Sequence, residues 1–273
     1  MFFSIITVVY NGANTIRDTI ESILNQNYMD YEYIVIDGAS TDQTVEIVNE
    51  YKPRFGGRLT LISEPDKGIY NAMNKGIKIA KGDYIWIVNS DDWIHDNALQ
   101  LIHDKYLTLN NPNAILCGGI NLISPKTQTI IRSAFSGGKH FDTMEKTFKM
   151  GVCHPATIVP SVIYQRVGCY DENYYIAADL DFIIRCKNDN IPFVFSDEIY
   201  SNFRMDGISN RFPIGKNIHD YRILLSKFIS NPIRRSFVLF KFKIRAVFLC
   251  LIGSRVEDLI MIRQAIKKPW KIQ

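Results

Sequence analysis

The 273-residue sequence has few cysteines and lacks several common enzyme motifs. Its five cysteines form no CxxC pair and are odd in number, so we expect reduced, mostly buried thiols rather than a disulfide framework. There is no GxxxxGK[ST] or GxGxxG loop, which argues against P-loop NTPases and dinucleotide oxidoreductases. HExxH and GxSxG are also missing, which argues against zincin metalloproteases and serine hydrolases.

A convincing signal peptide is missing as well. The apolar start has no basic residue before Arg17 and no small-residue cleavage site. We therefore expect a cytoplasmic catalytic domain. Charged residues also interrupt the apolar run 233–253, which makes it a poor transmembrane span.

The sequence does contain enough apolar residues for a sizeable core, at 47% hydrophobic and 22% charged. Its charge is uneven. Residues 232–273 hold ten Lys/Arg against two acids, whereas residues 1–231 hold 22 against 26, so a basic tail follows an acidic remainder. We expect a catalytic domain over 1–212 and a basic amphipathic helical extension over 213–273.

Short β-branched runs alternate with helical patterns in the first part of the chain. The runs predict strands over 4–10, 31–37, 58–63 and 83–88. Between them, apolar residues at helical spacing predict helices over 14–28, 41–51 and 69–80, the second opened by a Ser40–Gln43 capping box. A further helix is predicted over 177–189. This alternation indicates an α/β fold with a mostly parallel sheet.

Ligands bind beyond the carboxyl ends of the strands in such sheets. That rule selects the loops 10–12, 37–40, 64–68 and 89–92, and acids recur in three of them. In "IWIVNSDDW", Asp91 and Asp92 directly follow a buried run, and two adjacent carboxylates need water, a cation or a metal nearby. An isolated acid here often only caps a helix, as we expect for Asp42. Paired with an amide and a hydroxyl, however, the acids favour Mg²⁺ or Mn²⁺ shared with a diphosphate.

Four blocks of the sequence together resemble the inverting family-2 glycosyltransferases with the GT-A fold. They are "SIITVVYNGANTIRDTIESILNQNY", "YIVIDGASTDQT", "EPDKGIYNAMNKGIKIAKGDYIWIVNSDDW" and "YYIAADLDFIIR". Their order and spacing match over roughly residues 3–210, and the resemblance is to bacterial enzymes that extend surface polysaccharides. It implies a Rossmann-like nucleotide-binding half followed by an acceptor half.

The resemblance implies roles for residues at matching positions. Those implied to bind the nucleotide are Thr7, Val9, Tyr10, Asn11, Asp37, Asp66, Asn74, Ser90 and Asp91. Asp91 and Asp92 stand at the DxD-type motif and would bind Mn²⁺ or Mg²⁺, although Asn89 replaces the family's first acid. Which of the two acids is the direct ligand stays open.

Asp179 stands where the family places its catalytic base, with Ala178 in place of a frequent Glu. A carboxylate there can take the proton of an attacking sugar hydroxyl. Asp181 is the rival, since residues two apart on a helix point to different faces. His154 and Arg204 are possible acceptor or diphosphate contacts, but a structural histidine and a surface arginine are the competing interpretations.

The tail interleaves basic and apolar residues, which suits a helix lying at a membrane surface, although a helix packed on the domain has the same pattern. We expect a peripheral location at the inner face of the plasma membrane and no nucleic-acid partner, because recognition signatures are missing.

The predicted function is metal-dependent transfer of a sugar from a nucleotide diphosphate, with a UDP-sugar favoured. The acceptor would be a lipid-linked saccharide in surface polysaccharide synthesis, such as lipopolysaccharide or capsule. The alternatives are a sugar nucleotidyltransferase, which usually needs a glycine-rich signature, and a non-catalytic sugar-nucleotide binding module.

Overall fold

The computed structural model describes residues 2–109, 111–205 and 214–252. The chain divides into two compact units, Met1–Phe212 and Pro213–Gln273, and each is considered by itself. In the described part, the cysteines at 117, 153, 169 and 186 are free thiols; the one at 169 is exposed and those at 117 and 186 are buried.

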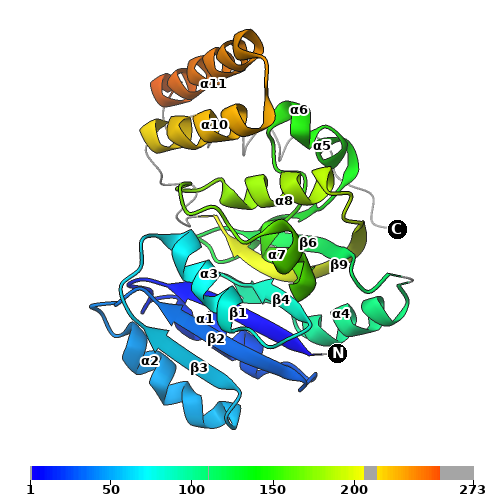
Figure 1. The fold of residues 1–273 in the computed structure, drawn as a ribbon. Coiled ribbons are helices and arrows are strands. Elements are labelled where there is room, and N and C mark those ends of the chain that lie inside the picture. The colour runs from blue at the N-terminus through cyan, green and yellow to red at the C-terminus, as the bar shows by residue number, and fades with distance from the viewer. Residues whose placement is uncertain (1, 110, 206–213, 253–273) are drawn as a thin grey trace. The chain divides into compact units, whose positions relative to one another are not determined.

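The N-terminal half of the first unit alternates strands and helices (Figure 1). Its elements are β1 (Phe3–Val9), α1 (Ile16–Leu24), β2 (Tyr31–Asp37), α2 (Thr44–Tyr51), the 3-10 helix η1 (Lys52–Phe55), β3 (Leu59–Ser63), α3 (Ile69–Ile79) and β4 (Tyr84–Ile87). The four strands run parallel in the order β3-β2-β1-β4. Every residue of β1 is buried, as expected for an inner parallel strand covered on both faces.

The second half of this unit continues the same sheet with mixed strand directions. Its elements are β5 (Trp93–Ile94), α4 (Ala98–Leu107), β6 (Ile115–Ile123), β7 (Ile130–Phe135), α5 (Gly138–Asp142), α6 (Met144–Thr147), the 3-10 helix η2 (His154–Ala156), β8 (Thr157–Pro160), α7 (Ser161–Val167), α8 (Ala178–Asn188) and β9 (Phe193–Arg204). β8 is antiparallel to both β4 and β6, whereas β9 is parallel to β6. The predicted α/β fold is confirmed, with the parallel pairing concentrated in the N-terminal half.

Strand register aligns the loops that position the site. Val9 at the end of β1 lies opposite Asp37 of β2, which in turn lies opposite Ser63 of β3. On the other side, the Val88 amide donates to the Ile6 carbonyl at 2.9 Å. The loops 10–12, 37–40, 64–68 and 89–92 therefore leave the sheet along one edge.

The start of α2 differs from the predicted capping box. Ser40 donates its hydroxyl to the Asp37 carboxylate and does not cap the helix, which begins at Thr44. Asp42 instead accepts the Thr44 amide at 3.0 Å and the Ala13 amide at 3.1 Å. Partial desolvation raises the pKa of Asp42, but the bonds from Thr44 and Ala13 outweigh it and hold that pKa below its usual value. The prediction was wrong because a nearby carboxylate competes for the serine hydroxyl.

The described part of the second unit is a pair of helices, α10 (Ile214–Phe228) and α11 (Pro232–Ile252). Tyr221 and Phe242 stack between them with ring centroids 3.7 Å apart, and Leu224 and Leu225 are buried. Among the described residues, no helix has the length and apolar character required to cross a bilayer.

Candidate active site

The loops after β1 and β2 hold each other through short polar bonds. The Asn11 amide donates to Ser40 Oγ at 2.8 Å, and Asn11 Oδ1 accepts the Thr41 amide at the same distance. Asp37 is fully buried and accepts the Ser40 amide at 2.9 Å and the Ser63 hydroxyl at 2.7 Å. Asn11 has a φ of 51°, in the left-handed region that asparagine tolerates better than most residues. This network fixes the loops after β1 and β2 in the half of the unit implied to bind the nucleotide.

Tyr10 and Asp66 lie close together beside Gly38. A Cβ added to Gly38 would lie 2.5 Å from Asp66 Oδ2 and 3.5 Å from Tyr10 Cδ2, so glycine permits their close approach. The Tyr10 side chain is 64% exposed at the end of β1, where a large ring is usually buried. An exposed ring beside a carboxylate offers a stacking surface and a hydrogen-bond acceptor for a nucleoside.

Besides Asp37, two further residues implied to bind the nucleotide lie beneath the surface. Thr7 is fully buried in β1 and accepts a hydrogen bond from the Tyr33 hydroxyl at 3.1 Å. Val9 is 4% exposed, and its carbonyl accepts the Gly38 amide at 2.9 Å. Both residues thus support the loops from below.

The adjacent acids after β4 have different environments. Asp92 is fully buried and accepts the Arg204 backbone amide at 3.1 Å and Asn89 Nδ2 at 3.3 Å. Burial and the charge of Asp91 raise the pKa of Asp92 well above its usual value. Asp91 is only partly buried, and its carbonyl accepts Arg204 Nη1 at 3.0 Å. The geometry therefore buries Asp92 among protein partners and leaves Asp91 partly exposed.

The same loop contains an oxygen that suits a hard cation. Asn89 Oδ1 is buried and has no hydrogen-bond partner in the part of the chain that the structure describes. Ser90 lies near the first loop, since a Cβ on Gly12 would be 3.5 Å from its Oγ. Oxygen donors of this kind match Mg²⁺ and Mn²⁺, which retain waters and take further ligands from substrate phosphates. A self-sufficient cluster of three His, Cys, Asp or Glu ligands is not found among the described residues.

Arg204 ties this loop to α1. Its guanidinium pairs with Asp18 of α1 and lies over the Trp93 ring at 4.7 Å from the centroid. With the Asp91 carbonyl, this gives the predicted diphosphate contact three partners inside the protein. Asp18 was missed by sequence reasoning because an acid in a first helical turn is ordinary, and its partner is far away in the sequence.

Asn74 connects the two halves of the unit. Its side chain accepts the Tyr170 amide at 3.0 Å and donates to the Tyr170 carbonyl at 2.8 Å. It also donates to Glu172 at 2.9 Å, as does Asn71. Asn74 therefore anchors the segment leading to α8, a contact that no local pattern indicated.

The two acids at the start of α8 also differ. Asp181 is fully buried, pairs with Arg185 Nε at 2.7 Å and accepts the Tyr174 hydroxyl at 3.2 Å. Asp179 is partly exposed, and its Oδ1 accepts the Leu180 amide at 2.7 Å. The structure thus assigns Asp181 to the packing of α8 and leaves Asp179 as the candidate base.

The charge of Asp179 affects the pKa values of nearby aromatic residues, including His154. His154 Nε2 lies 3.1 Å from the Tyr170 hydroxyl. Burial lowers the pKa of His154, and the charge of Asp179 opposes this shift in part. Burial, followed by the Asp179 charge, raises the pKa of Tyr70 well above its usual value. The sequence singled out His154 and Asp179 separately, and the fold places them in one electrostatic environment.

Comparison with known sequences identifies relatives of the chain. The profile described as Glycosyl transferase family 2 matches residues 4–160. A "PGL/p-HBAD biosynthesis glycosyltransferase" of Mycobacterium bovis is 31% identical over 185 residues, which are 67% of this chain and 69% of the relative. An uncharacterized glycosyltransferase of Rickettsia typhi is 26% identical over 243 residues, covering 87% of this chain and 74% of that protein.

Solved structures share the fold. TarS of S. aureus in complex with UDP-GlcNAc superposes with a TM-score of 0.63 at 18% identity, covering 89% of this chain and 71% of that one. A mannosyltransferase of Pyrobaculum calidifontis in complex with GDP-Man and Mn²⁺ gives 0.59 at 16% identity, covering 97% and 79%. These likenesses show the GT-A fold. The family profile and the mycobacterial relative show the family to which the chain belongs. The chain belongs to glycosyl transferase family 2.

Proposed function

We propose that this enzyme is a metal-dependent inverting glycosyltransferase that takes its sugar from a UDP-sugar. The observation that carries the proposal is the different burial of two acid pairs. Asp92 and Asp181 are fully buried, whereas Asp91 and Asp179 are partly exposed. One acid in the loop 89–92 and one at the start of α8 therefore remain accessible to substrates.

The donor would bind along the carboxyl edge of the parallel strands. Tyr10 offers its exposed ring to the base. Asp66 lies beside Tyr10 and would accept a hydrogen bond from a ribose hydroxyl. UDP is the favoured nucleotide because TarS, with the same fold, was solved with UDP and UDP-GlcNAc. GDP is the alternative suggested by the mannosyltransferase.

The residues fit a divalent cation at the diphosphate. Asp91 and Asn89 Oδ1 would hold it, with the Ser90 hydroxyl nearby, while Asp92 positions the loop through its bonds to Asn89 and Arg204. When bound, Mn²⁺ or Mg²⁺ supplies Lewis-acid stabilisation of negative charge on the diphosphate.

Asp179 supplies the base for attack by the acceptor. Its carboxylate takes the proton of a sugar hydroxyl as that oxygen bonds to the anomeric carbon. The bond from the anomeric carbon to the diphosphate oxygen breaks on the opposite side, which inverts the configuration. His154 lies in the same environment with its pKa lowered, so a neutral ring is available to orient the acceptor.

We further propose that the acceptor is a lipid-linked saccharide and that the product enters a cell-surface polysaccharide such as lipopolysaccharide or capsule. The support is the resemblance of the sequence blocks to enzymes of that kind.

The test is Asp179→Asn compared with Asp181→Asn, using UDP-sugar turnover and calorimetric UDP binding with Mn²⁺. Asp179→Asn should lower turnover by about 10² to 10⁴-fold while keeping UDP affinity. Asp181→Asn should reduce stability and keep most turnover per folded molecule, because it breaks the pair with Arg185. If Asp179→Asn turned over at the parent rate, Asp179 would not be the base.

The metal assignment has its own comparison. Asp91→Ala should abolish the gain in UDP affinity that Mn²⁺ provides, whereas Asp96→Ala, an exposed acid five positions later, should retain it. Equal Mn²⁺ dependence in both variants would remove Asp91 from the metal site.

A further inference from the structure

Helix α11 has an apolar side that faces solvent. Ile233, Phe237 and Phe240 are 80%, 56% and 61% exposed. Their spacing of four and three residues places them on one side of the helix. Large exposed apolar side chains that gather on one surface usually mark a site of interaction.

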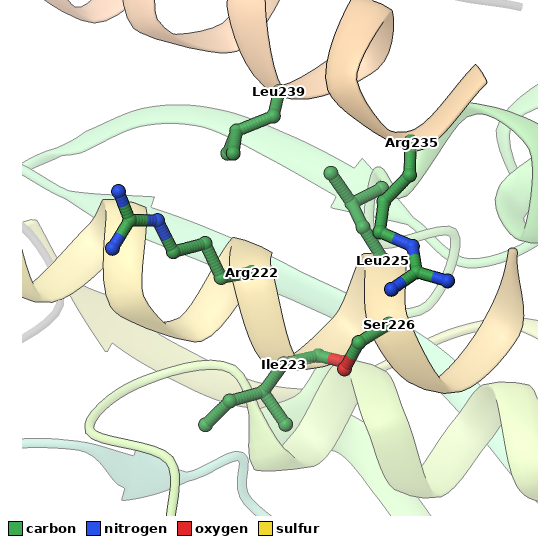
Figure 2. A pocket seen from close by; sticks show the side chains of 6 residues that line it. All are labelled: Arg222, Ile223, Leu225, Ser226, Arg235 and Leu239. Carbon is green, nitrogen blue, oxygen red and sulfur yellow. The ribbon is translucent and has the colours of Figure 1, made fainter. Parts of the chain in front are cut away.

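The other side of α11 already packs on α10. Phe242 stacks on Tyr221, while Arg235 and Leu239 line a cavity of about 430 Å³ together with α10 residues (Figure 2). Figure 2 shows the Leu239 and Arg235 side chains directed from α11 toward α10. The pairing of these helices therefore does not use the exposed side.

Positive charge borders the exposed apolar side. Arg234 and Lys241 are exposed, and Lys241 Nζ lies 4.3 Å from the Phe237 ring centroid. The α11 sequence holds five Lys/Arg and no acid, and residues 213–273 hold thirteen basic against three acidic residues. Like charge of this density opposes pairing with a second copy of the same helix and favours an anionic partner.

We propose that this side of α11 docks on an anionic lipid bilayer. Ile233, Phe237 and Phe240 enter the interface between headgroups and acyl chains, and Arg234 and Lys241 contact the phosphates. The cytoplasmic leaflet is the expected surface because its anionic lipids give it a negative potential. The inference concerns α11 alone and is independent of the donor chemistry.

The test is cosedimentation of the full chain with vesicles of phosphatidylcholine, with and without phosphatidylglycerol. The parent should bind the anionic vesicles at least about tenfold more tightly, with the difference falling as salt rises. Phe237→Ser should weaken this binding about tenfold, since burial of one aromatic side chain contributes at least that factor. Phe135→Ser removes a ring of similar exposure, 51%, from β7 and should bind as the parent does.

Three outcomes would overturn the proposal. They are equal affinity for both vesicle types, parent-like binding by Phe237→Ser, and a parent dimer in solution that Phe237→Ser dissociates. The last would identify a second copy as the occupant. Circular dichroism of each variant separates lost binding from lost folding, and the double variant Arg234→Gln/Lys241→Gln tests the charge without removing apolar area.

Discussion

Neighbouring carboxylates in this enzyme differ through their burial and partners rather than through their chemistry. Asp92 and Asp181 take bonds from Arg204 and Arg185 inside the fold, and each holds its element in place. Asp91 and Asp179 stay partly exposed a short distance along the chain. A buried carboxylate with protein donors fixes geometry, and an accessible one can act on a substrate.

His154 should make stability depend on pH. Burial lowers its pKa, so the unfolded chain binds a proton at a higher pH than the folded chain. The stabilising contribution is therefore present above the ordinary histidine value of about 6.5 and is lost as pH falls below it. Urea unfolding at about pH 8 and about pH 5 should show a smaller loss for His154→Gln than for the parent.

The exposed His140 provides the control for this prediction. His140→Gln should lose stability on acidification as the parent does. A loss by His154→Gln equal to that of the parent would show that this ring does not link folding to protonation.

At the scale of elements, hydrophobic patterns in the sequence predicted the strands and helices whose formation depends on local sequence. The expected strand 31–37 is β2 residue for residue, and the helix 69–80 is α3 to within one residue. β5 escaped prediction because its two residues become a strand only by pairing with β9, more than a hundred positions away. The expected acids did gather at one edge, since strand topology places them there. Their partners could not be predicted: Arg204 meets Asp18 through tertiary packing alone.

The Asn74 contact is one such long-range feature, and its loss should destabilise the enzyme. Asn74→Ala removes the side-chain atoms that bond the Tyr170 amide and carbonyl. These two backbone groups are then left without their hydrogen bonds in a largely buried position. Each orphaned group costs about 1–3 kcal/mol, so we expect a loss of roughly 2–6 kcal/mol in the free energy of unfolding.

Asn71→Ala is the matched control on the same helix, since it removes a bond to Glu172 and one from the exposed Lys67 amide and leaves the Tyr170 pairing intact. Urea unfolding should show a loss below about 1 kcal/mol for this variant. A similar loss in both variants would show that the Tyr170 bonds have no special weight. A raised KM for the sugar donor in Asn74→Ala alone would add that the contact shapes the pocket.

At the scale of the whole molecule, the two units carry opposite charge. Residues 1–212 hold 19 basic and 25 acidic residues, whereas residues 213–273 hold thirteen and three. A polyanionic donor approaching the first unit meets net repulsion, so a cation at Asp91 would offset the field of the unit as well as that of the diphosphate. The basic second unit suits an anionic surface.

Donor binding should therefore stabilise the protein much more strongly when metal is present than when it is absent. UDP with Mn²⁺ at a hundredfold excess over its Kd contributes about 2.7 kcal/mol, which raises Tm by roughly 5 to 10 °C in a chain of this size. UDP alone should give a small shift, and GDP or dTDP with Mn²⁺ a smaller one than UDP, as the proposed UDP-sugar donor requires. Scanning calorimetry of the parent and of Asp91→Ala measures these shifts. A larger shift with GDP would reassign the donor to GDP-sugars, and an equal UDP shift without Mn²⁺ would contradict metal dependence while leaving the family and fold in place.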